Sequence, residues 1–317
     1  MKRFFPIALL FIYMFCSCSG TIDKGKLSGE MTVPEPQSTP PVISGDIQLT
    51  YVESFGKTAG IVSPWGISFG VDGTLYVCDR DRSSIIRLDR EGTGVSRFTG
   101  SGSRTERLYS PVDVCSTGGL AIYAVDAANS RVLRFDRNLK HSYVLYKKDS
   151  RENRLFSSFN GLAFNKTTGD LFVTDRDTGA IIRIDMLGGT IKSMGAFGSG
   201  KESLHEPAGL DVGDDGTIFI ADKGAGAVAI LRHFGAEIRY IGSKVLESPV
   251  DVAAITDSTV AVACKNGVLV LTTSGIAVGI AGYGTDRTMS PRSVAYREGK
   301  LFISDGVSGS ILVYTIE

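Results

Sequence analysis

The chain has 317 residues, with 34 Lys and Arg side chains against 34 Asp and Glu side chains, and it contains 38 glycines. A net charge of zero argues against a nucleic-acid partner, because phosphate binding needs a strongly basic face. The glycine content exceeds the average of about 7% and is typical of a β protein with many turns. The composition therefore predicts a turn-rich β protein that does not bind nucleic acid.

Residues 1–18 have the pattern of an export signal. Two basic residues precede an apolar run that is too short to span a bilayer comfortably. The run ends in Cys16-Ser17-Cys18, which resembles the lipobox of bacterial lipoproteins, where a Cys becomes the lipid-modified first residue. Because small Ser17 precedes Cys18, we expect lipidation at Cys18. The resemblance implies an exported protein anchored in a membrane and facing the periplasm or the cell exterior; ordinary secretion is the alternative.

Residues 19–46 are predicted to form a flexible tether. Four prolines lie among Ser, Thr, Gly and charged residues in this stretch, which has too little apolar surface to fold. As a coil it would reach about 30 Å. The folded part is therefore predicted to comprise residues 47–317, held near the membrane.

From residue 47 onward, six segments share one pattern. Each opens with a short apolar strand, in five cases at a proline, and continues into a second apolar strand that ends in Asp or Cys. These end residues are Asp79, Asp126, Asp175, Asp222, Cys264 and Asp305, spaced by 41 to 49 residues. That period is expected of propeller blades and is too long for most solenoid repeats.

The first segment shows how a blade is built. Strands are predicted over 64–69, 74–79, 84–89 and 94–99, separated by short turns. Alternating apolar and polar residues and Asp-Gly turns are typical of antiparallel meanders. Six units of four strands predict an all-β fold, a six-bladed β-propeller.

The sixth unit ends after its third strand, at 310–315. An unassigned strand lies upstream of the first blade, within 47–57. We therefore expect the N-terminal strand to complete the sixth blade and close the ring, which removes two exposed sheet edges.

The repeat resembles the NHL-repeat family. The openings Pro64-Trp65-Gly66-Ile67 and Pro207-Ala208-Gly209-Leu210 match its pattern, and Asp126-Ala127-Ala128-Asn129-Ser130-Arg131 matches the segment after the second strand. The resemblance covers the chain after the tether and implies a six-bladed propeller. It implies no single activity, because NHL relatives include enzymes, peptide binders, RNA binders and extracellular scaffolds.

Binding is predicted on one face of the ring. The interblade connections and the second-to-third turns share that face and include long segments at 100–110, 147–158 and 198–206. Long loops on a rigid scaffold often carry binding residues. We call this the long-loop face and the opposite one the short-turn face. A closing fourth strand begins on the short-turn face, so we expect the tether to leave from there.

The first strand of each blade is predicted to line the central channel. The residue after each strand start should ring the mouth on the long-loop face; these residues are Trp65, Val112, Asn160, Ala208, Val250 and Arg292. We predict that Trp65, Asn160 and Arg292 bind the partner, since Trp and Arg are favoured at interfaces. Alternatively, Trp65 packs between blades or stacks on Arg292.

Three carboxylates are predicted deeper in the channel. Asp113 and Asp251 come from opposite blades and should face each other, with Asp211 below them. Oxygen ligands of this kind suit Ca²⁺ or Mg²⁺, but a solvated channel without a metal is the expected state, and no cofactor is predicted. The strand-ending Asp residues are expected to be structural and to accept hydrogen bonds from the following turn.

The sequence offers little for catalysis. The amidating lyases among NHL relatives hold zinc with histidines, and this chain has only His141, His205 and His233, in unrelated positions. We therefore expect a non-catalytic, membrane-tethered binding or scaffold module of the cell envelope whose partner is a protein, peptide or glycan. The alternative is a metal-dependent hydrolase or lyase of the lactonase or gluconolactonase type.

Overall fold

The structure is a computed structural model that describes residues 42–45, 47–100, 107–119, 121–140, 142–147, 158–195, 203–232, 234, 237–283 and 287–317. The predicted export signal, Cys18, most of the tether, His141, His233 and much of the three long loops at 100–110, 147–158 and 198–206 lie outside this part of the chain. The described residues all belong to one compact unit, Thr39–Glu317. Among them, no helix is long and apolar enough to cross a bilayer.

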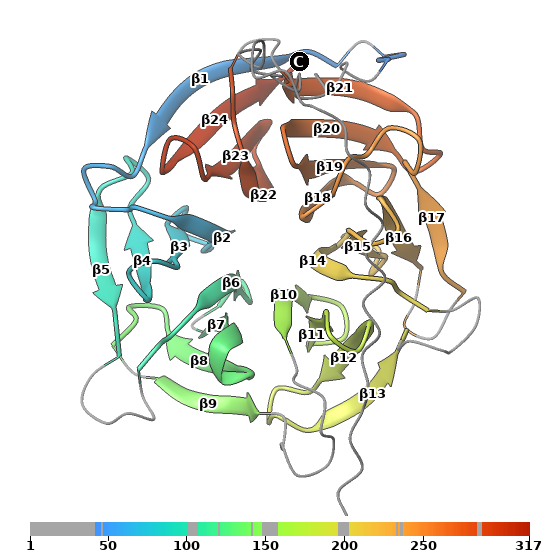
Figure 1. The fold of residues 1–317 in the computed structure, drawn as a ribbon. Helices are drawn as coiled ribbons and strands as arrows, with labels where there is room; N and C mark the ends of the chain where they lie inside the picture. Colours follow the sequence, from blue (N-terminus) through green and yellow to red (C-terminus); the bar gives the residue numbers. More distant parts are fainter. Residues whose placement is uncertain are drawn as a thin grey trace, which may run out of the picture. The chain divides into compact units, whose positions relative to one another are not determined.

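In the described part, 24 strands form six four-stranded antiparallel sheets around a ring (Figure 1). The inner strands are β2 (Pro64–Phe69), β6 (Pro111–Ser116), β10 (Phe159–Asn165), β14 (Pro207–Val212), β18 (Asp251–Thr256) and β22 (Pro291–Arg297). The second strands are β3 (Leu75–Asp79), β7 (Ala121–Asp126), β11 (Asp170–Asp175), β15 (Ile218–Asp222), β19 (Thr259–Cys264) and β23 (Lys300–Asp305). The third strands are β4 (Ser84–Leu88), β8 (Arg131–Asp136), β12 (Ala180–Ile184), β16 (Ala227–Leu231), β20 (Gly267–Thr272) and β24 (Ser310–Ile316). The outer strands are β5 (Gly94–Phe98), β9 (Ser142–Lys147), β13 (Thr190–Met194), β17 (Arg239–Ile241), β21 (Ala277–Gly282) and β1 (Leu49–Phe55).

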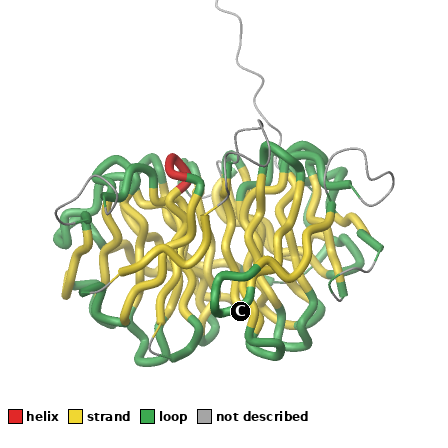
Figure 2. The backbone as a smooth tube through the Cα atoms, turned by 90° about the horizontal axis from the view of Figure 1, so that it is seen from below, coloured by secondary structure: helices red, strands yellow, loops and turns green. Residues whose placement is uncertain are grey.

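Blade 1 comprises β2 to β5, and the blades follow in chain order to blade 6. A short 3₁₀ turn, η1 (Ala127–Asn129), lies between β7 and β8 and marks the long-loop face in side view (Figure 2). The predicted six-bladed propeller is therefore confirmed.

The N-terminal strand closes the ring. β1 pairs antiparallel with β24, from Leu49 opposite Ile316 to Phe55 opposite Ile311. The main chains of Gln48 and Glu317 exchange two hydrogen bonds of 3.0 Å, which extends this pairing to the end of the chain. Blade 6 thus has the strand order β1-β24-β23-β22, as predicted.

The residues just before β1 lie along the start of β21. The Ser44 N–H donates to the Ala277 carbonyl and the Ile47 N–H donates to the Val278 carbonyl, at 2.9 and 3.1 Å. Since β21 begins on the short-turn face, the described residues 42–45 lie at that face too; the rest of the predicted tether is outside the described residues.

The hydrophobic core is divided among the seams between blades. The described residues form six buried clusters, and each joins two neighbouring blades. Tyr123 and Phe159 belong to the cluster between blades 2 and 3, whereas Ile67 and Ile311 belong to the one across the ring closure. The second strands pack apolar side chains on both faces, so β3 is buried at every position.

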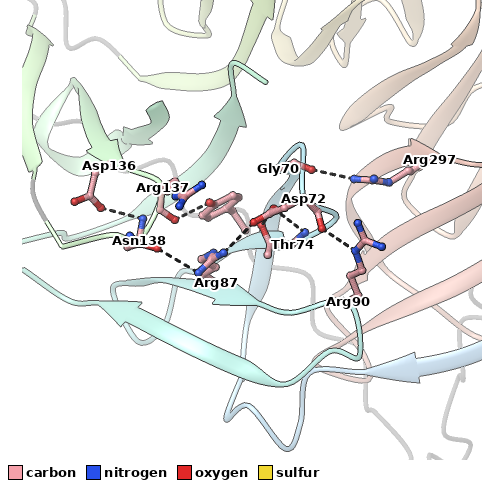
Figure 3. Close-up of polar contacts among 10 residues, drawn as sticks. Gly70, Asp72, Thr74, Arg87, Arg90, Asp136, Arg137, Asn138 and Arg297 are labelled. Carbon is pink, nitrogen blue, oxygen red and sulfur yellow. Dashed lines mark hydrogen bonds and ion pairs between the residues drawn. The ribbon is translucent and has the colours of Figure 1, made fainter. Parts of the chain in front are cut away.

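A chain of polar contacts on the short-turn face also crosses the closure (Figure 3). Arg297 of blade 6 donates to the Gly70 carbonyl of blade 1 at 2.9 Å. Within blade 1, Arg87 pairs with Asp72 at 3.1 Å and also donates to the side chain of Asn138 in blade 2. The ring is therefore joined across blades 6, 1 and 2 by both apolar and polar contacts.

The strand-ending Asp side chains hold the interblade connections. Asp79 accepts the N–H groups of Val62 and Ser63, at 3.2 and 3.0 Å. Asp126 and Asp222 each accept two consecutive N–H groups of the preceding connection in the same way. Their structural role is as expected, but the main partners differ from the predicted following turn. The connection enters its first strand beside the end of the second, so its free N–H groups point at that carboxylate.

Three strand ends differ from this pattern. The following turn contributes further N–H groups at Asp222 and Asp305. In blade 5 the thiol of Cys264 occupies this position. Cys78, Cys115 and Cys264 are all buried and form no disulfide with one another, in agreement with the prediction of buried thiols.

Candidate functional site

Bulges in the inner strands present the predicted mouth residues. In blade 1, Pro64 lies opposite Asp79 but Ile67 lies opposite Val77, so the register slips by one residue between them. The same slip occurs at the start of the inner strand in blades 2, 3, 4 and 6. In blade 5 the inner strand begins at Asp251, two residues after Pro249, and its irregularity comes later. Bulges bend a strand and re-aim a side chain, here at the position next to the channel mouth.

The mouth residues surround a cavity at the long-loop end of the channel. This upper chamber has a volume of about 150 Å³ and is lined by all six predicted mouth residues: Trp65, Val112, Asn160, Ala208, Val250 and Arg292. Arg176, Glu206 and Lys223 add charged side chains to its lining. Pockets for a whole small molecule are typically about 300–1,000 Å³. The upper chamber is therefore of a size to receive the end of a larger ligand.

The Trp65 ring carries two guanidinium groups. The guanidinium carbon of Arg80 lies 4.3 Å from the ring centroid and that of Arg292 lies 5.3 Å away. Trp65 is half-buried and also packs against the apolar clusters on both sides of blade 2. Both alternatives for Trp65 therefore occur: it stacks on Arg292 and it packs between blades. Trp65 thus holds cations at the mouth and does not project freely into it.

Arg292 and Asn160 offer polar groups to the chamber. The Arg292 side chain is exposed, and Asn160 is partly exposed. Apart from the stacking of Arg292 on Trp65, neither side chain has a hydrogen-bond or ion-pair partner within the described part of the chain. Their polar atoms are therefore available to a ligand that enters from the long-loop face.

A second cavity opens at the short-turn end. This lower chamber has a volume of about 350 Å³ and includes Asp211, Asp214, Asp257 and Lys166 in its lining. Lys166 pairs with Asp214 at 3.3 Å, and both side chains are largely exposed. The two ends of the channel therefore differ in charge, with cations concentrated at the upper mouth and acids at the lower one.

Asp113, Asp251 and Ser293 line both chambers and form the waist between them. Asp113 leans over Gly66 of blade 1, and Asp251 leans over Gly209 of blade 4; a Cβ atom at either glycine would overlap the carboxylate. The structure thus places Asp113 and Asp251 where the sequence predicted, at opposite sides of the channel and below the mouth.

Each channel carboxylate links its own blade to the next. Asp113 accepts the Leu162 N–H of blade 3 at 2.7 Å. In blades 5 and 6 the corresponding donors are Ala254, which donates to Asp211 at 2.9 Å, and Val294, which donates to Asp251 at 3.0 Å. Inner strands of neighbouring blades do not pair as a ladder, so their N–H groups need other acceptors. The three acids therefore have a structural role in the ring.

The pKa values of the same three acids are raised above that of an ordinary Asp. Burial raises the pKa of Asp113 well above its usual value, and the charge of Asp251 raises it further. Burial also raises the pKa of Asp251 to about 7 and that of Asp211 to about 6. The N–H groups that these carboxylates accept oppose the rise, because they favour the charged form.

No three His, Cys, Asp or Glu side chains of the described residues gather closely enough to hold a metal ion. Asp113, Asp211 and Asp251 do not form such a group. His205 is exposed in an interblade connection, with its Nδ1 atom 3.6 Å from Asp222. The described residues thus offer a divalent cation at most a pair of carboxylates at the waist.

Cations from outside the inner strands also lie near the mouth, and these were not among the predicted site residues. Arg80, Arg176 and Lys223 each follow a strand-ending Asp directly, and blade 5 has Lys265 at the same position. Arg or Lys occupies this position in four of the six repeats, and that pattern could have indicated a group of cations on the long-loop face. Whether these side chains reach the channel depends on the turn after the second strand. In the structure, Arg176 and Lys223 line the upper chamber.

No protein-family model and no curated protein sequence matches the chain. Solved structures with a similar fold include a streptogramin B lyase, with a TM-score of 0.60 and 14% identity over 85% of this chain and 88% of that chain. A PQQ-bound aldose sugar dehydrogenase from Streptomyces coelicolor has a TM-score of 0.57 and 17% identity over 88% and 100%. A chain of a nidogen/laminin complex has a TM-score of 0.55 and 18% identity over 68% and 83%. At these identities the likeness shows the fold alone, and propellers of this shape include both enzymes and binding proteins.

Proposed function

We propose that this chain is a lipid-anchored, NHL-type propeller of the bacterial cell envelope that binds a protein, peptide or glycan without catalysis. The partner contacts the long-loop face and inserts one end into the upper chamber. The observation that carries the proposal is the convergence of Trp65, Asn160 and Arg292 around a cavity of about 150 Å³, with the polar atoms of Asn160 and Arg292 lacking protein partners among the described residues.

The rigidity of the ring supports this function. Trp65, Asn160 and Arg292 lie on inner strands at bulges in the pairing with the second strand. A site that is already ordered loses little conformational entropy when a ligand binds. The channel carboxylates favour binding over catalysis because their oxygens accept main-chain N–H groups of the ring.

Binding arrays test the proposal directly. The full chain, Arg292→Ala and Lys166→Ala would be applied to arrays of bacterial and host glycans and of short peptides. Lys166 is a matched control, because it is a cation at the opposite end of the channel. We expect ligands whose binding is lost in Arg292→Ala and kept in Lys166→Ala. Ligands that bind all three proteins equally, or no ligands at all, would contradict a site at the upper mouth.

A metal-dependent hydrolase or lyase is the second candidate. The observation in its favour is the pair Asp113 and Asp251 at the waist, with raised pKa values of the kind found at functional sites. An enzyme of the lactonase or gluconolactonase type would turn over lactones only with Ca²⁺ or Mg²⁺ present, and Asp113→Asn would abolish turnover. We expect no turnover, and metal-dependent turnover that Asp113→Asn removes would decide for the enzyme.

A further inference from the structure

The rim of the upper chamber carries a ring of cations. The main-chain N–H of the residue after each strand end donates to the interblade connection, as in the bonds of 3.0 Å from Arg80 to Ser63 and from Arg176 to Ser158. This bond fixes the turn that bears the side chain. Arg176 and Lys223 consequently line the chamber, while Arg80 and Arg292 are held on the Trp65 ring.

Acids at the rim balance only part of this charge. Lys223 pairs with Glu206 at 3.6 Å, and Arg176 pairs with Asp177 at 3.8 Å. Among the described residues, no carboxylate lies within ion-pair distance of Arg80 or Arg292. A guanidinium supported by an aromatic ring and lacking an acid partner suits a planar anion, because its fork matches a carboxylate with two parallel hydrogen bonds.

The floor of the chamber has the opposite character. Asp113 and Asp251 face it from two sides, and their interblade hydrogen bonds occupy only part of their acceptor capacity, since each carboxylate oxygen has two lone pairs. A ligand that matches the chamber therefore presents a negative group at the rim and, at the floor, hydroxyl groups, which can both donate to and accept from the two carboxyl groups. Asn160, which also lines the chamber, can both donate and accept.

We propose that the upper chamber binds a uronic acid, a sugar unit with a carboxylate, at the end of an acidic glycan. This inference rests on the proposed function and specifies its ligand. The sugar carboxylate would pair with Arg292, and hydroxyl groups on the other side of the sugar ring would donate to Asp113 and Asp251. Val112, Ala208 and Val250 give the wall apolar surface for the C–H faces of the ring. A peptide C-terminus with an apolar side chain has the carboxylate but would leave the floor acceptors without donors.

Calorimetric titration of the full chain with matched ligands tests the inference. The probes are a trigalacturonic acid, its carboxyl-reduced neutral counterpart, and a short peptide as free acid and as amide. We expect the trigalacturonic acid to bind at least tenfold more tightly than the reduced sugar and the peptides. Arg292→Ala should weaken it at least tenfold, as expected for a lost charge-assisted hydrogen bond, whereas Lys166→Ala should change it less than twofold. Raising the salt concentration should weaken binding, because the rim is exposed to solvent.

Two kinds of result separate this inference from the proposed function. Failure of the trigalacturonic acid to bind, or equal binding of the reduced sugar, overturns the uronic-acid inference. If Arg292→Ala nevertheless abolishes binding of the reduced sugar or a peptide, the mouth is a binding site for another ligand and the proposed function stands. If no ligand depends on Arg292, both fall.

Discussion

The carboxyl groups at the waist line the channel and also bind neighbouring blades to one another. Asp113 and Asp251 each reach across a seam to a main-chain N–H, and each needs a glycine in the preceding blade. An acid in the channel sequence therefore does not by itself indicate a ligand site. The channel side chains without a hydrogen-bond or ion-pair partner among the described residues include Arg292 and Asn160 of the mouth.

The titration of Asp251 predicts a pH-dependent stability. Its pKa is about 7 in the folded chain and about 4 for an ordinary Asp, so the folded state binds more protons between these values. The free energy of unfolding should therefore be highest at low pH within this window and fall as pH rises from 4 to 7, by roughly 1 kcal/mol per pH unit for one carboxyl. In Asp251→Asn the side-chain oxygen still accepts the Val294 N–H but no longer titrates. Urea denaturation at several pH values should give a shallower slope for this variant; an unchanged slope would assign the effect to other groups.

The close approach of Asp251 to Gly209 predicts a costly substitution. In Gly209→Ala the new methyl group would overlap the Asp251 carboxylate, which is held by its bond to Val294. Overpacking of this kind costs about 1–3 kcal/mol. Gly119→Ala is the control, because its Cβ would meet little but the Thr117 hydroxyl at 3.9 Å. Thermal melting should show a clear loss for the first variant and a small change for the second; similar melting temperatures would mean that the waist can relax.

At the scale of elements, the end of each second strand organises the long-loop face. Asp79, Asp126 and Asp222 hold the connection that leads into their own blade, and the next residue adds a main-chain bond to the same connection. The strand-ending residues that mark the blades in the sequence thus also position the cations that follow them at the mouth.

Removing one of these carboxylates should loosen its connection. Asp79→Ala leaves the N–H groups of Val62 and Ser63 without their acceptor, and a hydrogen bond to a charged group contributes about 1.5–3 kcal/mol. Asp257→Ala, an exposed change on the other face, should cost little. Hydrogen exchange should show faster exchange confined to the amides of residues 61–63 in Asp79→Ala. Unaltered exchange there would show that the carboxylate is dispensable.

Strand positions were predictable because alternation and turn residues are local signals. The inner strand 64–69 has its predicted bounds, and the mouth and waist positions follow from counting along it. The division of the channel at the waist was not predictable, because it depends on how far Asp113 and Asp251 lean across a seam. The inward direction of Arg176 and Lys223 likewise depends on the curvature of the ring.

At the scale of the whole molecule, closure joins the two ends of the described chain. β1 covers the edge of β24, and Phe55 and Phe302 make an edge-to-face contact at 6.4 Å beside the closing seam. These contacts make blade 6 dependent on the N-terminal strand.

A truncation series should show this dependence. A chain that starts at residue 42 keeps β1 and should melt within a few degrees of the full chain. A chain that starts at residue 57 lacks β1, exposes the edge of β24 and loses contacts of Phe55; we expect a large loss of stability and aggregation, because an open edge pairs with other chains. Size-exclusion chromatography and thermal melting distinguish the two. A monomeric, equally stable chain from residue 57 would contradict closure by β1.

The emission of Trp65 tests the binding site at the upper mouth most directly. Trp65 is the only tryptophan in the chain, and its ring lies beside Arg292 in the wall of the upper chamber. Titration with any ligand that the arrays identify should change the Trp65 emission in a saturable way, with the same Kd as calorimetry, and Arg292→Ala should remove the change. A ligand that saturates the protein by calorimetry while the Trp65 emission stays constant would show that the partner binds elsewhere on the propeller.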